Sequence, residues 1–314
     1  MNLLALAYGA GVRARNALYE RGTLHPRVLA GPVVSVGNLS LGGSGKTPFV
    51  LLLGALLGER GVSFDVLSRG YGRQTKGVAL VDPSGSPREF GDEPLLLARR
   101  LAVPVIVGED RFRAGELAET KFGPQAHLLD DGFQHRSLAR DFDIVLVTPE
   151  DIHDRLLPAG RLREPLSSLR RADAVVLTGG ASPASLPVAG KFLWRIRRGI
   201  SVPDVPAPVV GFCGIARPRN FFTALRGAGI EPLAEAVYPD HHRYCEADIS
   251  DLRRLREQSQ ADGFVTTEKD AINLGGYLSD LQPIAVVEVK MELVDAANAV
   301  DTMLRVVGER KAEA

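Results

Sequence analysis

Short, nearly continuous apolar runs recur between residues 33 and 177, and stretches of helical pattern separate them. The runs are rich in β-branched residues, which favours strands buried on both faces of a sheet. This alternation predicts an α/β fold with a doubly wound, mostly parallel sheet. The predicted strands are 33–36, 64–67, 105–107, 127–129, 144–147 and 174–177, and the predicted helices between them include 95–101 and 111–121.

The pattern changes after residue 178, where Gly, Ala, Ser and Pro become frequent in 179–190 and 201–208. Between these stretches, residues 192–198 alternate apolar and basic side chains, like an exposed or linker strand. A second alternating set follows, which predicts a smaller α/β domain that closes over the first. Its predicted strands are 209–213, 233–238, 263–267 and 284–289, and its predicted helices are 219–227, 247–259 and 296–307. We therefore expect a first domain over 26–185, a linker over 186–208 and a second domain over 209–314.

The composition of the chain limits the classes of partner and metal site that the protein is expected to have. Lys plus Arg and Asp plus Glu both number 38, so the net charge is zero, which argues against a protein that wraps nucleic acid over a broad face. Cys213 and Cys245 lie far apart without CxxC spacing, which disfavours a disulfide framework and a zinc site and fits a reducing compartment. We expect no nucleic acid and see no sign of an obligate protein partner.

The chain opens with an uncharged apolar segment, Met1 to Val12, and Arg13, Arg15 and Arg21 follow it. A segment of this length is too short to span a bilayer, which needs roughly 20 apolar residues. A secretory signal would carry its basic residues before the apolar stretch. We expect a helix within residues 1–25. From the residues alone it is either an interfacial helix with arginines at lipid phosphates or an ordinary helix packed on the domain.

Residues 40–47 read SLGGSGKT and directly follow the first predicted strand. This sequence is typical of a phosphate-binding loop, whose backbone N–H groups cradle a polyphosphate, and it predicts a P-loop NTPase-type fold. Lys46 would reach the β- and γ-phosphates, and the Thr47 hydroxyl would hold Mg²⁺. Position 40 is Ser40 where the pattern asks for glycine, and the alternative interpretation is a flexible turn that binds nothing. The predicted nucleotide-binding residues are Gly42, Gly43, Ser44, Gly45, Lys46, Thr47 and Pro48, and an amphipathic helix is expected from Phe49 to Leu57.

Asp130 and Asp131 follow the predicted buried strand 127–129. A nucleotide site of this type needs an acidic residue at a strand end to hold or orient Mg²⁺. Adjacent carboxylates beside a buried strand are costly unless a cation or donors meet them. The alternative interpretation is an exposed turn, because Asp131-Gly132 is also a turn signal. We predict that Thr47 and one of the two aspartates place the metal.

The hexapeptide DDGFQH at 130–135 is rarer than a generic acidic strand end. Together with six other motifs, in order from about residue 1 to 300, it resembles the tetraacyldisaccharide 4′-kinase (LpxK) family of lipid A biosynthesis. A serine or threonine in place of the first loop glycine is usual in that family, so Ser40 agrees with the resemblance. The other motifs are SVGNLSLGGSGKTP (35–48), SRGYGR (68–73), GDEP (91–94), LPAGRLREP (157–165), PDHH (239–242) and TTEKD (266–270).

The resemblance implies that Asp92 is the general base at a substrate hydroxyl and that His241 is its partner. From the residues alone, Asp92 is equally a carboxylate favoured in the first turn of a helix. The run Asp240-His241-His242 also suggests a metal site, but adjacent histidines on a strand point apart and no third ligand is evident.

Arginines beside a ring in SRGYGR suit a phosphate on a sugar, although arginine is also a common solvated surface residue. The resemblance assigns such arginines to the phosphorylated disaccharide and to the nucleotide pocket without dividing them. Lys269 and Asp270 in TTEKD either clamp the nucleotide or pair with each other, and their adjacency does not match the NKxD spacing of guanine-reading GTPases. The predicted substrate-binding residues are Arg69, Tyr71, Gln134, Arg163 and Glu164.

What the resemblance implies is a reaction of ATP, with Mg²⁺, and a tetraacylated glucosamine disaccharide 1-phosphate, to give lipid IVA and ADP. A four-chain lipid stays in the membrane, which favours the N-terminal segment as an interfacial anchor on the cytoplasmic leaflet of the inner membrane. Two other classes are weighed against this one. A metal-delivery GTPase would need Cys/His ligands and a guanine motif, which are missing, and an ATP-gated membrane scaffold would not require Asp92 and His241.

Overall fold

The computed structural model describes residues 3–205 and 207–313, so Met1, Asn2, Pro206 and Ala314 of the predicted segments lie outside the described residues. The strands are β1 Val33–Asn38, β2 Phe64–Ser68, β3 Ala79–Leu80, β4 Val105–Val107, β5 Ala126–Asp130, β6 Phe142–Val147, β7 Ala174–Leu177, β8 Phe192–Ser201, β9 Val209–Cys213, β10 Ala234–Val237, β11 Gly263–Thr267 and β12 Ile284–Leu293. The α-helices are α1 Leu3–Glu20, α2 Lys46–Glu59, α3 Pro87–Phe90, α4 Asp92–Leu101, α5 Arg111–Phe122, α6 Pro149–His153, α7 Pro218–Gly227, α8 Glu246–Ser259, α9 Glu268–Leu274 and α10 Ala296–Glu313. Short 3₁₀ turns lie at Leu166–Arg171, Pro183–Ser185 and Gly275–Leu281.

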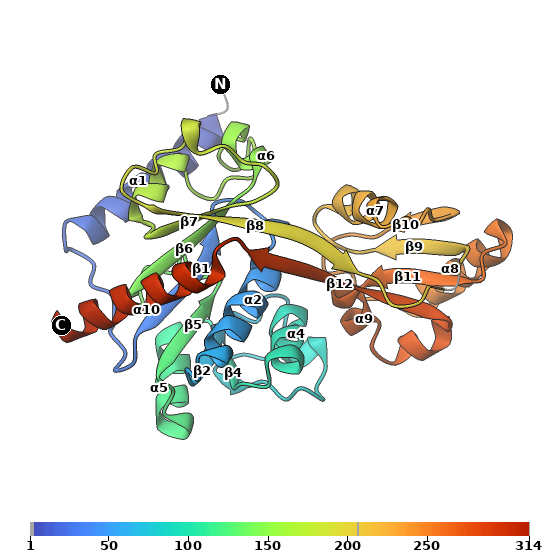
Figure 1. Cartoon of the computed structure of the whole chain (residues 1–314), viewed down its shortest axis with the longest axis horizontal. Helices are drawn as coiled ribbons and strands as arrows, with labels where there is room; N and C mark the ends of the chain where they lie inside the picture. Colours follow the sequence, from blue (N-terminus) through green and yellow to red (C-terminus); the bar gives the residue numbers. More distant parts are fainter. Residues whose placement is uncertain (1–2, 206, 314) are drawn as a thin grey trace.

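The strands form one sheet in the order β10-β9-β11-β12-β8-β7-β6-β1-β5-β2-β4-β3. Neighbours are parallel from β8 to β4 and again from β10 to β12, whereas β3 and β4 pair antiparallel at one edge. The α/β class and the mostly parallel sheet are therefore as predicted. The antiparallel pairing of β8 with β12 was not predicted. These two long strands run from the first body, which holds β1–β7, to the second body, which holds β9–β11 (Figure 1).

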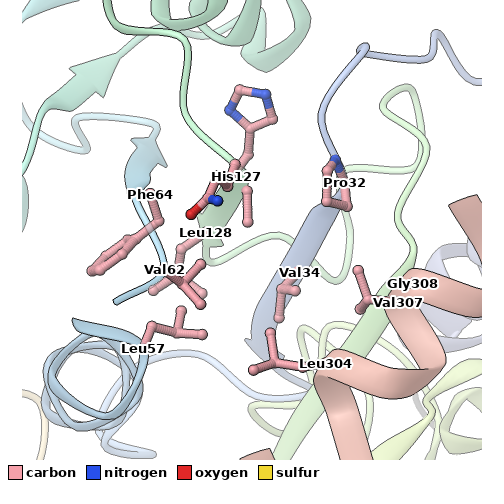
Figure 2. Close-up of a pocket in the computed structure, with 12 residues that line it drawn as sticks. Pro32, Val34, Leu57, Val62, Phe64, His127, Leu128, Leu304, Val307 and Gly308 are labelled. Carbon is pink, nitrogen blue, oxygen red and sulfur yellow. The ribbon is translucent and has the colours of Figure 1, made fainter. Parts of the chain in front are cut away.

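The second half of the chain does not stay in the second body. Helix α10 returns across the sheet, and its Val300, Met303 and Val307 belong to the same buried cluster as β1 and α2. Figure 2 shows Leu304 and Val307 beside Val34 at the edge of a small apolar hollow. The division at 186–208 stays a prediction, but the part proposed as linker contains the ten-residue strand β8 and the last helix packs on the first body.

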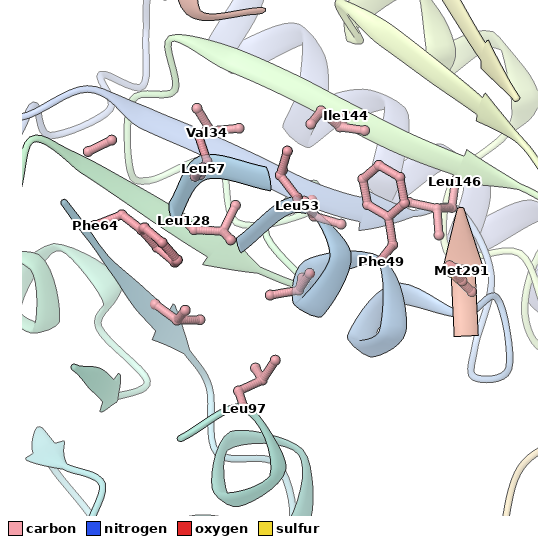
Figure 3. Close-up of a cluster of buried hydrophobic side chains, with 14 of the residues drawn as sticks. Val34, Phe49, Leu53, Leu57, Phe64, Leu97, Leu128, Ile144, Leu146 and Met291 are labelled. Carbon is pink, nitrogen blue, oxygen red and sulfur yellow. The ribbon is translucent and has the colours of Figure 1, made fainter. Parts of the chain in front are cut away.

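The largest buried cluster lies around α2 (Figure 3). Phe49, Leu53 and Leu57 of this helix are buried against β1, β5 and β6, and Met291 of β12 lies in the same cluster. The prediction of an amphipathic helix here was wrong, because Leu51, Leu52 and Leu56 also pack on the core. Helices α4 and α10 and strand β12 surround α2, so little of its surface reaches water.

The N-terminal helix α1 packs on the first body through a few contacts and leaves apolar side chains exposed. Gly9 is its buried residue, while Leu3, Leu6 and Leu18 are exposed. Within the described ranges, no helix combines the length and the apolar character needed to cross a bilayer.

Candidate active site

The predicted phosphate-binding loop, residues 40–47, connects β1 to α2. Gly42, Gly43 and Gly45 all have positive φ, between 57° and 86°, a region that a residue with a Cβ enters at a cost. Ser40 is not among the residues with positive φ, and it is fully buried. A glycine is therefore not needed at position 40, and the departure from the usual pattern leaves the loop conformation intact.

The two aspartates after β5 have different surroundings. Asp131 accepts two hydrogen bonds from Arg163, at 2.9 and 2.8 Å, and lies 3.4 Å from the Lys46 Nζ. Lys46 also donates to Asn38 Oδ1 at 3.0 Å. Burial would raise the pKa of Asp131, but Lys46 and Arg163 outweigh it and hold that pKa well below its usual range.

Asp130 is buried and has fewer partners than its neighbour. Its Oδ2 accepts a hydrogen bond from the Ser68 hydroxyl at 3.0 Å, and its Oδ1 has no partner within the described chain. Burial, with the charges of Glu93 and Asp131, raises the pKa of Asp130 to about 7. An unpartnered carboxylate oxygen in excess negative charge is a site that a cation would satisfy, so Asp130 suits a Mg²⁺ ligand better than Asp131 does.

This arrangement has the few protein ligands that Mg²⁺ uses beside a nucleotide. Mg²⁺ keeps several waters and takes one or two protein oxygens plus phosphate oxygens. Thr47, two residues after Gly45 and buried, lines the cleft. In the part of the chain that the structure describes, no group of three or more His, Cys, Asp or Glu side chains is arranged to hold a metal ion by itself. The alternative of a metal at Asp240-His241-His242 is not supported, because His242 instead pairs with Asp248 at 2.9 Å.

Asp92 and His241 meet although 149 residues separate them. Asp92 is the first residue of α4, after Gly91 with φ 90°, and His241 lies in a turn with φ 59°. The His241 Nδ1 is 2.8 Å from Asp92 Oδ2, and Asn273 donates to the same oxygen at 3.1 Å. Asp92 is 4% exposed. Burial would raise the pKa of Asp92, but His241, Lys269 and Asn273 together lower it to about 2.

Lys269 of α9 completes this network. Its Nζ donates to Glu93 Oε1 at 2.9 Å and lies 3.4 Å from the His241 Nε2. The sequence predicts either that Lys269 binds the nucleotide or that it pairs with Asp270. Asp270 instead accepts from Gly214 N and from the Tyr244 hydroxyl, so it holds the second body together. The sequence does not predict the contacts of Asn273 and Lys269 with Asp92 and Glu93. A residue on a helix of the second body carries no sequence signal that it will contact α4.

The predicted substrate residues fall into two places. Arg163, Glu164 and Gln134 lie beside α1, where Asn16 donates to Glu164 at 2.9 Å and Arg15 donates to the backbone oxygen of Gln134 at 2.9 Å. Gln134 itself donates to the backbone oxygen of Asn38. The other two are exposed: Arg69 follows β2, and the ring of Tyr71 lies 5.2 Å from the ring of His241.

A cleft of about 510 Å³ lies between the two bodies, beside the Asp92–His241 pair. The loop residues 42–48 form one wall, and Ile200, Phe221, Val287 and Val289 of the second body form an apolar wall. His241, Lys269 and Glu93 also line it, and Asp92 lies directly behind His241. The five predicted substrate residues do not line this cleft among the described residues. The structure thus brings the loop and the Asp92–His241 pair to one cleft and leaves the arginine clusters around it.

Comparisons with known proteins agree over nearly the whole length. A family model described as tetraacyldisaccharide-1-P 4′-kinase matches residues 1–308. A tetraacyldisaccharide 4′-kinase of Koribacter versatilis is 52% identical, covering 99% of this chain and 100% of that protein. One from Aquifex aeolicus is 41% identical, covering 85% and 86% of the two chains. The crystal structure of LpxK from Aquifex aeolicus in complex with ATP superposes with a TM-score of 0.78 at 35% identity and covers 97% of each chain.

Proposed function

The chain belongs to the tetraacyldisaccharide 1-phosphate 4′-kinase family and is an ATP-dependent kinase of lipid A biosynthesis, and we propose a role for each residue of its cleft. It transfers the γ-phosphoryl group of ATP to the 4′-hydroxyl of the tetraacyldisaccharide 1-phosphate. The new bond joins the 4′-oxygen to phosphorus, the bond to the β,γ-bridging oxygen breaks, and the hydroxyl proton leaves. The products are lipid IVA and ADP.

One observation supports these proposed roles. The predicted phosphate-binding loop forms one wall of the cleft, and His241, which is paired with Asp92, lies on another. The backbone N–H groups of the loop and Lys46 bind the phosphates and stabilise charge that builds on the transferred group. Thr47 and Asp130 would hold Mg²⁺, which would neutralise phosphate charge when bound. Asp131 keeps Lys46 and Arg163 in place through its ion pairs.

Asp92 accepts the proton of the 4′-hydroxyl, and His241 orients it. The carboxylate is ionised at neutral pH, because the pKa of Asp92 is lowered to about 2. Hydrogen bonds from His241 and Asn273 fix the direction of its oxygens. Such a positioned base typically contributes about 10²–10⁴-fold to the rate.

Incubation of the pure protein with γ-labelled ATP and the disaccharide 1-phosphate in detergent tests this function, and label should appear in the lipid. Lys46→Ala should lower turnover by about 10²–10³-fold while thermal unfolding stays close to that of the wild type. Lys290→Ala, at an exposed position on β12, is the matched control. Hydrolysis of ATP without labelled lipid would favour the ATP-gated scaffold and overturn the kinase assignment.

We also propose that α1 holds the protein on the cytoplasmic leaflet of the inner membrane. Its exposed leucines would enter the interface, and Arg13 and Arg21, which are also exposed, would meet anionic headgroups. The same helix touches the predicted substrate residues, since the Tyr8 hydroxyl donates to the backbone oxygen of Arg163 at 2.9 Å. Lipid held by α1 would therefore lie next to the site.

Flotation with phosphatidylglycerol vesicles tests the membrane role. A double substitution, Leu3→Gln with Leu6→Gln, should reduce flotation and raise the KM for lipid but not for ATP, because each buried leucine contributes about 1.5–3 kcal/mol. Binding should weaken with salt without vanishing. Leu233→Gln, at an exposed leucine of the second body, is the control. Equal flotation of both variants would place the lipid contact elsewhere.

A further inference from the structure

Strand β8 presents one arginine to the phosphate-binding loop and another away from it. In the antiparallel pairing with β12, Arg198 is opposite Met291 and Arg197 is opposite Glu292. Directly opposed residues of an antiparallel pair place their side chains on the same face of the sheet. Met291 lies against the loop, since its Cε is 2.6 Å from where a Cβ on Gly45 would be. Arg198 therefore shares the face of the sheet that looks toward the loop, and it lines the cleft.

A second arginine lies over the loop itself. Arg217 precedes α7, and its Cγ and Cδ would be 2.6 and 2.7 Å from a Cβ added at Gly43. Its guanidinium donates to Glu150 at 3.0 Å and to the Thr148 hydroxyl at 3.3 Å. The turn at the start of α6 thus holds the Arg217 side chain over the loop in the cleft.

The charges of the two arginines are not balanced equally. Arg198 has no hydrogen bond and no ion pair within residues 3–205 and 207–313, whereas Arg217 has Glu150 at 3.0 Å and Asp151 at 3.8 Å. Arg198 is exposed toward the open cleft, and the surrounding protein and the charge of Arg217 both lower its pKa. Two neighbouring guanidinium groups are unfavourable together unless an anion joins them. Arginine forks match phosphate oxygens in geometry as well as in charge.

We propose that Arg198 and Arg217 bind the polyphosphate of ATP from the side opposite the phosphate-binding loop. This inference rests on the proposed kinase function and adds the second body's share of nucleotide binding. Because Arg198 lies on the strand that joins the two bodies, the nucleotide would hold the second body against the loop. The 1-phosphate of the lipid substrate offers the same chemistry, so the experiment must separate the two sources.

Arg198→Gln and its neighbour Arg197→Gln form a matched pair on opposite faces of β8. Titration calorimetry with ATP and with ADP, without lipid, should show binding weakened by about 10- to 100-fold in Arg198→Gln and unchanged in Arg197→Gln. Steady-state kinetics should show a raised KM for ATP with little change in kcat, because the contact is already made in the ground state. Arg198→Lys should recover part of the affinity, since it restores the charge but not the fork.

Two outcomes would overturn the proposal. In one, Arg198→Gln binds ATP as Arg197→Gln does; in the other, only the KM for the lipid changes, which assigns Arg198 to the 1-phosphate. Thermal unfolding of each variant checks that the fold is retained, which is expected because Arg198 makes no hydrogen bond or ion pair within residues 3–205 and 207–313. Failure of the kinase function itself would look different, since the wild type would then bind ATP without labelling lipid.

Discussion

Two histidine–aspartate pairs in this molecule have the same geometry and different surroundings. In both, the histidine Nδ1 lies 2.8 Å from an aspartate Oδ2, in His241–Asp92 at the cleft and in His127–Asp65 within the sheet. Asp65 and His127 are register partners on β2 and β5 and are fully buried. The His241–Asp92 pair instead joins a loop of the second body to α4 of the first. The short hydrogen bond alone therefore does not distinguish the proposed catalytic pair from a structural one.

The group at the other ring nitrogen does distinguish them. The His127 Nε2 lies 3.3 Å from a carboxylate oxygen of Glu119, which favours the protonated ring. The His241 Nε2 lies 3.4 Å from the Lys269 ammonium, which opposes protonation, although Asp92 still outweighs it and raises the pKa of His241. The hollow of about 220 Å³ beside His127 is mainly apolar (Figure 2), whereas the cleft beside His241 holds the phosphate-binding loop. One pair holds strands together, and the other keeps a carboxylate ionised directly behind the histidine that lines the cleft.

The largest expected effect is on the cleft pair. Asp92→Ala should lower kcat by about 10²–10⁴-fold with a smaller effect on ATP affinity, because it removes the proton acceptor. His241→Ala should share much of that loss, and the double variant should be little worse than Asp92→Ala, since the two residues act as a unit. Single-turnover kinetics of the three variants measure this. A double variant that shows the full product of two large single losses would contradict the paired roles.

Replacement of Lys269, the group at the second ring nitrogen of His241, tests how the surroundings of this pair differ from those of His127–Asp65. Lys269→Met removes the ammonium at the His241 Nε2, so the pKa values of Asp92 and His241 should both rise. The acid limb of the kcat profile should then move to higher pH, with little change at neutral pH, because Asp92 stays ionised there.

The matched control for Lys269→Met is Lys290→Met, at an exposed position on β12. An unchanged pH profile with a raised KM for ATP would instead assign Lys269 to the nucleotide, which is the other role that the sequence left open.

Much of the fold could be predicted from the sequence because its signals are local. Apolar runs gave β1, β5 and β9 within a residue or two, and SLGGSGKT placed the loop. Contacts between distant elements carry no such signal. Nothing in 192–198 shows that Arg198 faces the loop and Arg197 does not, since this depends on the register with β12. The sequence predicts His127 only as part of an apolar strand, because its carboxylate partners come from β2 and α5.

The structural pair should affect stability rather than rate. His127→Gln leaves Asp65 buried without its partner, so the free energy of unfolding should fall by about 1–3 kcal/mol. The kcat at a temperature where the protein stays folded should be unchanged, because His127 does not line the cleft. His25→Gln, at an exposed position, is the control. A loss of kcat without loss of stability would mean that the two pairs are not distinct in role.

The smallest expected effect is the pH dependence of this stability. Burial alone would lower the pKa of His127, but Asp65 and Glu119 outweigh it and raise that pKa above its ordinary value of about 6.5. The folded state therefore binds this proton more tightly than the unfolded state does. The stabilisation is fully present below about pH 6.5 and is lost as the pH rises through the folded-state pKa. Urea unfolding of the wild type and of His127→Gln across this range should give curves that converge as the pH rises. The subtraction cancels titrations that do not involve this pair, and a difference that stays constant across this range would show that His127 is neutral in the folded protein.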